Sequence, residues 1–364
     1  MKKQFMDKPI HVTQPSLPPL VEYVQFLKEI WETGILTHNG PLLQRLEREL
    51  SIKLGIKNFI AVTNGTVAIQ MAIKALDLKG EIITTPFSWV ATISAIKWEG
   101  CTPIFCDVDS QSLNIDTSKL ESLISDKTVA IMPVHVFGNP CDVEGIARIA
   151  KKYNLKVIYD AAHAIGSTYK GKSVFEFGDI SATSLHGTKL LNTAEGGGCI
   201  TTNQELFERL KRIRFFGHDN SKVVIEDGFN GKMTEVHAAL GLANLKYFED
   251  VLQDRKAKYF RYYHALSGNG QFTFQRLNGD GCNYSYFPII FKNEEQLIEV
   301  ERRLNENGVY PRRYFYPSLN TMNHIVGSVS MPISENISQR ILCLPLYKNL
   351  TNEEVDSIIR IIIE

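Results

Sequence analysis

The feature that most constrains this chain is an alternation of short apolar runs with helix-like segments between residues 57 and 203. The apolar runs are rich in β-branched residues and nearly continuous, which is typical of strands buried on both faces. The predicted strands are 59–63, 81–86, 103–109, 129–138, 156–162, 180–186 and 198–203. The predicted amphipathic helices between them are 66–78, 90–100, 117–125 and 143–154. This alternation predicts an α/β fold whose mainly parallel sheet is covered on both sides.

The pattern changes after residue 232. Residues 233–266 form a helical stretch that is too long for one packed helix without a bend. Beyond it, the sequence predicts a smaller α+β unit with strand-like and helix-like segments at 283–291, 294–308, 309–317 and 353–363. We therefore expect a large domain over residues 1–245, which includes the N-terminal segment, and a small C-terminal domain over residues 246–364.

Composition excludes several classes of partner. The chain has 40 Lys+Arg and 40 Asp+Glu residues, so its formal net charge is zero. Nucleic acids and anionic membranes are bound through an excess of positive charge, and neither is therefore predicted as a partner. The six cysteines contain no C-x-x-C pair, so neither a disulfide scaffold nor a metal site is predicted.

The N-terminal residues begin with basic side chains but contain no apolar core of a signal peptide. No stretch approaches the roughly 18 apolar residues of a membrane span. The sequence therefore predicts a soluble, cytoplasmic protein.

Polar residues that follow the predicted strands are the candidate site residues, because ligands of open α/β sheets gather beyond the carboxyl ends of the strands. The turn 63–66 (Thr-Asn-Gly-Thr) ends a strand and begins a helix. The first N–H groups of a helix suit a phosphate, and Gly65 allows a close approach of the backbone. A plain turn with a capping threonine is the alternative.

Asp160 ends the strand KVIYD and is followed by Ala161, Ala162 and His163. A carboxylate at this place lies in a crevice, away from bulk water, and needs a cationic partner if it is ionised. The alternative is an aspartate that only caps the next turn.

Lys189 follows a strand in the segment Ser184–Lys189 and precedes the glycine run 196–198. A lysine between apolar segments can have a lowered pKa and act as a nucleophilic amine that forms a Schiff base. The alternative is the solvated surface position of most lysines.

Trp89 also comes just after a strand, where it could cover one face of a flat ring or simply pack in the core. A phosphate turn, an aromatic plate, a carboxylate and a strand-end lysine follow one another along the chain. Together they are the parts of a pyridoxal 5'-phosphate (PLP) site, in which the carboxylate keeps the pyridine nitrogen protonated. The combination is far more specific than any one of these residues.

At this level of detail the sequence resembles the DegT/StrS-type nucleotide-sugar aminotransferases, which have the aspartate-aminotransferase fold (PLP fold type I). The similarity runs over nearly the whole chain. It is carried by TQPSLPPL (13–20), LTHNGP (36–41), TNGTVAI (63–69), TTPFSWVAT (84–92), PVHVFGNPCD (133–142), IYDAAHAIG (158–166), SLHGTKLLNTAEGG (184–197), FNGKMTEVHAALG (229–241) and RRYFYP (312–317).

The resemblance implies roles for individual residues. Lys189 would bind the cofactor covalently and Asp160 would pair with its pyridine nitrogen. His163 would lie near the ring hydroxyl, and Trp89 would stack on the ring. The phosphate would be held by Gly65, Thr66 and Ser184. Asn230 would reach the phosphate of the cofactor in a partner subunit, which implies a homodimer with shared active sites.

Three positions depart from the usual family pattern. Asn64 stands where serine is common, and Gly187 stands where proline or alanine is common. Both changes leave backbone contacts intact. Lys232 stands where arginine is common, and its ammonium group cannot reproduce a bidentate guanidinium contact.

The resemblance implies transamination of a nucleotide-linked keto-6-deoxyhexose with L-glutamate as the amino donor. The chain most resembles the subset that converts dTDP-4-keto-6-deoxy-D-glucose to dTDP-4-amino-4,6-dideoxy-D-glucose for O-antigen and lipopolysaccharide biosynthesis. Residues 13–20, Tyr314 and Tyr316 carry this resemblance, and the two tyrosines would line the sugar site. Alternatively, they are strand residues that pack the small domain.

Other substrates and activities remain open at this stage. The alternative substrates are a dTDP-3-keto-6-deoxyhexose, aminated at C3, and a UDP-linked ketosugar. A dehydratase of the same family would have histidine in place of Lys189. A non-catalytic regulator would lack part of the PLP site. A sugar-binding protein without a cofactor would show no loss of cofactor absorbance when it is treated with borohydride.

Overall fold

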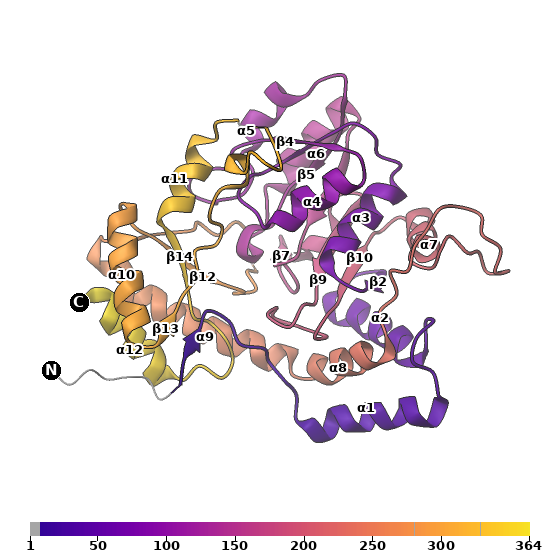
Figure 1. Cartoon of the computed structure of the whole chain (residues 1–364), viewed down its shortest axis with the longest axis horizontal. Helices are drawn as coiled ribbons and strands as arrows, with labels where there is room; N and C mark the ends of the chain where they lie inside the picture. Colours follow the sequence, from indigo (N-terminus) through magenta and orange to yellow (C-terminus); the bar gives the residue numbers. More distant parts are fainter. Residues whose placement is uncertain (1–7, 280, 328) are drawn as a thin grey trace.

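A seven-stranded sheet forms the centre of the larger part of the molecule (Figure 1). The computed structural model describes residues 8–279, 281–327 and 329–364. In spatial order the strands are β2 (Phe59–Val62), β10 (Gly197–Ile200), β9 (Ile180–Ser184), β6 (Lys156–Asp160), β5 (Thr128–Met132), β3 (Glu81–Thr84) and β4 (Thr102–Phe105). Only β10 runs antiparallel to its neighbours within this sheet. The predicted α/β fold with a mainly parallel sheet is confirmed.

Helices cover both faces of this sheet. Successive side chains of a strand point to opposite faces, and both faces carry apolar side chains that the helices bury. In β3, Ile82 packs on one face with helices α3 (Gly65–Ala75), α4 (Val90–Trp98) and α7 (Gln204–Ile213). Ile83 packs on the other face with α6 (Val143–Tyr153). The same face carries α2 (Pro41–Leu54) and α8 (Glu235–Leu245), and α1 (Leu20–Thr33) lies outside them.

All seven predicted strands of the large sheet exist, but several are shorter than expected. The run predicted as a strand over 129–138 ends at Met132, and a 3-10 turn follows at Val136–Gly138. Phe137 has a φ of 58° there, which is incompatible with an extended strand. The predicted helix over 117–125 is a short α5 (Thr117–Leu120) followed by a 3-10 turn.

The bend predicted within residues 233–266 is confirmed. Helix α8 ends at Leu245 and α9 (Phe248–Leu266) begins after Tyr247. Thr234 caps α8 by accepting a hydrogen bond from the N–H of His237. The bend lets α8 pack on the large sheet while α9 reaches the smaller unit (Figure 1).

The smaller unit has its own antiparallel sheet and apolar cluster. The sheet has the order β11 (Thr273–Phe274), β12 (Phe287–Ile290), β14 (Ile341–Leu344). Its strands pack with α9, α10 (Glu294–Glu306) and α12 (Asn352–Ile363), and α11 (Pro332–Arg340) precedes β14. The division of the chain at residues 245 and 246 stays a prediction.

The N-terminal segment joins this smaller unit before the chain enters the larger one. Strand β1 (Ile10–His11) pairs in parallel with β13 (Val309–Tyr310), and Ile10 is buried in the apolar cluster of the smaller unit. A separate two-stranded ribbon consists of β7 (Thr168–Tyr169) and β8 (Lys172–Ser173). Within the described residues, no helix combines the length and apolar character needed to cross a membrane.

Candidate active site

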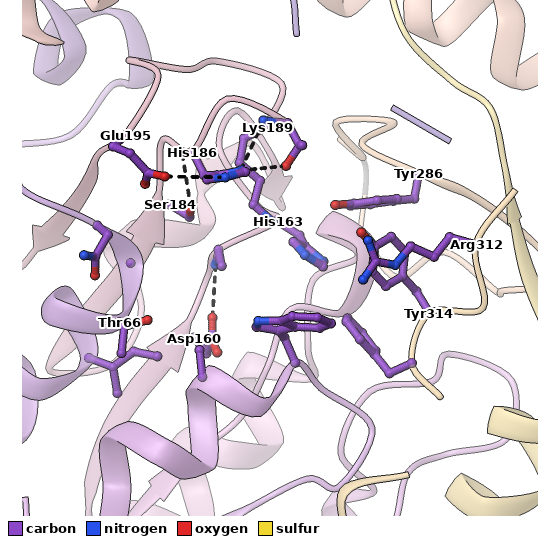
Figure 2. Close-up of a pocket in the computed structure, with 18 residues that line it drawn as sticks. Thr66, Asp160, His163, Ser184, His186, Lys189, Glu195, Tyr286, Arg312 and Tyr314 are labelled. Carbon is purple, nitrogen blue, oxygen red and sulfur yellow. Dashed lines mark hydrogen bonds and ion pairs between the residues drawn. The ribbon is translucent and has the colours of Figure 1, made fainter. Parts of the chain in front are cut away.

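A cavity of about 450 Å³ lies at the carboxyl ends of β6 and β9, beside the start of α3 (Figure 2). This is the edge of the sheet where the sequence predicts a ligand site. Eight of the predicted site residues line it. They are Gly65, Thr66, Trp89, Asp160, His163, Ser184, Lys189 and Tyr314.

Asp160 is buried at the end of β6, with 5% of its surface exposed. Its Oδ2 accepts a hydrogen bond from Thr92 Oγ1 at 2.7 Å, and its Oδ1 accepts one from the N–H of Ala162 at 3.2 Å. Burial raises the pKa of this carboxyl, while the two hydrogen bonds and the charge of Lys189 act in the opposite direction. Asp160 therefore both caps a turn and presents a buried acid to the cavity, so the two interpretations of the sequence are compatible.

Lys189 lies in a tight turn after β9, where its N–H donates to the carbonyl of His186 at 2.8 Å. Burial lowers the pKa of its amine from 10.5 to about 8, although the carboxylate of Asp160 raises it. A larger fraction of the amine is therefore neutral near pH 8 than for a solvated lysine. Lys189 is therefore not in the solvated surface position that is the alternative interpretation of the sequence.

The phosphate turn predicted at 63–66 is the N-terminus of α3. Asn64 is the capping residue, because its side chain accepts a hydrogen bond from the N–H of Val67 at 2.9 Å. The expected alternative of a capping threonine is therefore wrong. A Cβ at position 65 would lie only 3.1 Å from the Cβ of Ser184, so glycine permits the close approach of α3 to β9.

His163 is buried beside this acid and amine, with 9% of its surface exposed. Its Nδ1 atom is buried and has no hydrogen-bond partner within the described part of the chain. Its ring lies 4.8 Å from the ring of Tyr286 and 5.8 Å from that of Phe315, measured between centroids. Burial lowers the pKa of His163 well below its usual value, which keeps the imidazole neutral.

Trp89 is not a core aromatic, since 51% of its surface is exposed. Its ring lines the cavity and meets the ring of Tyr314 edge to face, with 6.4 Å between centroids. The guanidinium of Arg312 lies over both rings, 5.5 Å from Trp89 and 4.8 Å from Tyr314. Trp89 and Tyr314 therefore line one side of the cavity with aromatic rings (Figure 2).

A comparison with known protein families accounts for this arrangement. The profile described as the DegT/DnrJ/EryC1/StrS aminotransferase family matches residues 21–363. The chain belongs to this family. Its aminotransferases depend on PLP, so this chain is a PLP-dependent aminotransferase, as the sequence predicts.

Individual relatives and solved structures agree with this assignment. A Shigella dysenteriae protein named dTDP-4-amino-4,6-dideoxy-D-glucose transaminase is 40% identical over 365 residues, which cover 99% of this chain and 100% of the relative. The crystal structure of DesI in the presence of its TDP-sugar product superposes with a TM-score of 0.92 at 26% identity, covering 98% of this chain and 93% of DesI. NtdA from Bacillus subtilis, solved with bound cofactor PMP, has a TM-score of 0.86 at 30% identity, covering 95% and 82% of the two chains.

Two residues that the family resemblance assigns to the site lie outside the cavity in this single chain. The side chain of Asn230 is exposed, and its Oδ1 accepts a hydrogen bond from Lys232 Nζ at 2.6 Å. Tyr316 is half exposed, and the guanidinium of Arg313 lies 3.7 Å from the centre of its ring. Their predicted roles toward a partner's cofactor and toward the sugar stay predictions.

Several cavity residues of this aminotransferase were not predicted from the sequence. They are His186, Glu195, Tyr286 and Arg312. Thr92, which donates a hydrogen bond to Asp160, was not predicted either. His186, Glu195 and Arg312 lie within motifs that carry the family resemblance, so their polar side chains were available signals. Thr92 also lies within such a motif (84–92), but a threonine in a helix is usually structural. Tyr286 lies outside these motifs, just before β12, and carries no such signal.

Proposed function

We propose that this aminotransferase converts dTDP-4-keto-6-deoxy-D-glucose to dTDP-4-amino-4,6-dideoxy-D-glucose with L-glutamate as the amino donor. The observation that supports transamination is that Lys189, Asp160 and the start of α3 line one cavity. The substrate is supported by the 40% identity to the transaminase named for this sugar. We also propose that the reaction takes place in the cytoplasm and serves O-antigen and lipopolysaccharide biosynthesis.

The cavity fits a bound PLP in three respects. Asp160 is a buried carboxylate whose hydrogen-bond donors among the described residues are the uncharged Thr92 hydroxyl and the N–H of Ala162, and a protonated pyridine would supply a charged partner. The buried Nδ1 of His163 has no hydrogen-bond partner among the residues that the structure describes, so it is free to bond to the ring hydroxyl. The start of α3 offers backbone N–H groups of the kind that bind phosphate, next to Ser184.

Bound PLP supplies an electron-withdrawing ring that stabilises negative charge on the substrate carbon that loses a proton. In our proposal, Asp160 would hold the proton of the pyridine nitrogen, and Trp89 would cover the ring. Gly65, Thr66 and Ser184 would bind the phosphate. Lys189 would attach the cofactor through its amine and would also accept and return the proton that leaves the substrate carbon.

The experiment that tests the proposed function is a substrate panel. Purified enzyme is incubated with L-glutamate and 4-keto or 3-keto dTDP-6-deoxyhexoses or UDP-linked ketosugars, and the products are identified by NMR. We expect amination of the dTDP-linked 4-keto sugar. Exclusive amination of the 3-keto isomer, or of a UDP-linked sugar, would contradict the assignment of the substrate while leaving the aminotransferase activity in place.

The lowered pKa of Lys189 predicts a pH dependence of cofactor binding. Only the neutral amine attacks an aldehyde, and its fraction increases with pH. The rate of PLP uptake by cofactor-free protein should therefore rise with pH and level off above about 8, instead of near 10.5. Stopped-flow absorbance measures this rate. In an Asp160→Asn variant the plateau should begin at lower pH, because the charge that raises the Lys189 pKa is gone. A plateau near 10.5 would contradict the lowered pKa of Lys189.

Tyr314 is proposed as a sugar contact, with Tyr316 nearby on the same segment. Tyr314 lines the cavity opposite the start of α3, beside Trp89 (Figure 2). Tyr314→Phe should lower ketosugar turnover by about 5- to 10-fold, the value of one hydrogen bond, and leave the glutamate half-reaction unchanged. Single-turnover absorbance separates the two half-reactions. Equal losses in both would show that Tyr314 only packs the small unit.

We propose a homodimer with shared active sites. Large apolar side chains on α1 and on the loop before residue 230 are exposed, including Trp31 at 77% and Val224 at 62%. Large apolar side chains left exposed on two elements are candidates for contact with another protein. Asn230 lies on the same loop, where it could reach a partner's cofactor phosphate.

Complementation between two inactive variants tests this dimer. Lys189→Ala and Asn230→Asp should each be inactive, the second because its carboxylate would repel the phosphate. Co-expressed chains should recover about one quarter of wild-type activity, since half of randomly paired dimers are mixed and each has one intact site. Mixed dimers isolated with two affinity tags that remain inactive would show that each site belongs to one chain.

A further inference from the structure

His186 and Glu195 lie at the two ends of the loop that carries Lys189, and both side chains line the cavity. The loop connects β9 to β10 and is closed by backbone hydrogen bonds. Gly187 N–H donates to the carbonyl of Ala194 at 2.6 Å, and Leu185 N–H donates to that of Gly196 at 2.8 Å. The two side chains are therefore held in a defined position relative to the Lys189 turn.

The contacts of His186 determine which of its nitrogens carries the proton. Its Nδ1 accepts a hydrogen bond from the N–H of Thr188 at 3.3 Å and lies 2.9 Å from Thr188 Oγ1. A backbone N–H can only donate, so the proton of the neutral ring is on Nε2. Nε2 lies 3.6 Å from Glu195 Oε1, so the protonated edge of the ring is turned toward the carboxylate (Figure 2).

The charge of Glu195 favours contact with the hexose of the proposed substrate and disfavours contact with its diphosphate or with the amino donor. A carboxylate accepts hydrogen bonds from hydroxyl groups, which a hexose ring provides. It repels the carboxylates of an amino donor and the diphosphate of a nucleotide sugar. The cationic side chain of Arg312 lies on the other side of the cavity in Figure 2, so the two sides differ in charge.

We propose that Glu195, oriented by His186, accepts a hydrogen bond from the hexose hydroxyl next to the carbon that is aminated. This pair belongs to the loop of Lys189 and lines the same cavity, so it would lie near the reacting carbon if Lys189 has the role proposed above. The inference rests on the proposed function and deepens it, because it makes Glu195 a specificity residue for the sugar. The hydroxyl concerned in dTDP-4-amino-4,6-dideoxy-D-glucose is the one on C3.

The test measures binding of this product to the PMP form of the enzyme, which cannot react with it. Calorimetry compares wild type and Glu195→Ala with the product, its 3-deoxy analogue and dTDP alone. We expect Glu195→Ala to weaken product binding by about 10- to 100-fold, as for a hydrogen bond to a charged group, and to leave dTDP binding unchanged. The wild type should lose the same factor with the 3-deoxy analogue, and the variant should lose nothing further.

Two more variants control the experiment. Glu205→Ala removes an exposed carboxylate on α7 outside the cavity and should bind the product as the wild type does. His186→Asn should weaken product binding on its own but have no further effect in the Glu195→Ala background, since it acts through Glu195. The glutamate half-reaction of Glu195→Ala, followed by cofactor absorbance, should stay within about threefold of wild type.

Several outcomes would overturn the proposal. Unchanged product binding by Glu195→Ala, an equal loss of dTDP binding, or additive losses with the 3-deoxy analogue would each show that Glu195 does not bind this hydroxyl. These results would leave the proposed function standing if the wild type binds and forms the product. A wild-type enzyme that neither binds nor forms it would refute both.

Discussion

Lys189→Ala should abolish transamination, with a fall in turnover of more than about 10⁴-fold, the upper range for one positioned acid-base group. The loss is this large because one amine is proposed to perform two tasks, attachment of the cofactor and transfer of the proton. No second lysine lines the cavity within the described part of the chain. Turnover is measured with L-glutamate and the dTDP-linked 4-keto sugar.

Borohydride reduction of wild-type holoenzyme provides an independent measurement. Peptide mapping should find the pyridoxyl label on Lys189 and should find none in the variant. Lys170→Ala is the matched control, because Lys170 is an exposed lysine that pairs with Glu144 at 2.6 Å outside the cavity. A label on another lysine of the wild-type enzyme would contradict the proposed role of Lys189.

Asp160→Asn is expected to have the next largest effect, a loss of turnover on the order of 10²- to 10³-fold. Asparagine keeps the shape of the side chain but carries no charge to hold a protonated pyridine. Breaking a buried ion pair costs about 3–5 kcal/mol, and each 1.4 kcal/mol corresponds to about a factor of ten. Turnover and the absorbance spectrum of the bound cofactor measure the effect.

The same substitution separates the two roles of this residue. The amide oxygen of asparagine can still accept the hydrogen bond that Asp160 receives from the N–H of Ala162. A variant with unchanged thermal stability and greatly reduced turnover would therefore assign the loss to charge. Near-normal turnover would mean that Asp160 serves only as a cap.

The central sheet and its site could be predicted because they depend on local pattern. A strand that is buried on both faces is apolar at nearly every position, as in β2 and β5, so a polar residue that ends such a strand stands out, as Asp160 does in β6. Parallel strands bring such residues to one edge of the sheet. Asp160 and Lys189 were found in this way, although they are 29 residues apart in the sequence.

The limits of several elements could not be predicted, because they depend on contacts that the local sequence does not contain. The apolar run 129–138 continues past the point where β5 ends at Met132, since the buried residues after it pack against other elements without being strands. Helices α1, α2, α7 and α11 were not predicted.

By itself, the sequence determined the α/β architecture and the family, and it predicted the acid, amine and phosphate turn proposed for the site, because each has a local signature in residue type and spacing. The tertiary structure alone decided how these groups are supported. Thr92 bonds to Asp160 across 68 residues, and Tyr286 meets His163 from the smaller unit. It also decided that His186 and Glu195 face each other across the Lys189 loop. Such contacts depend on side chains that only the packing of distant segments brings together, so no local pattern encodes them.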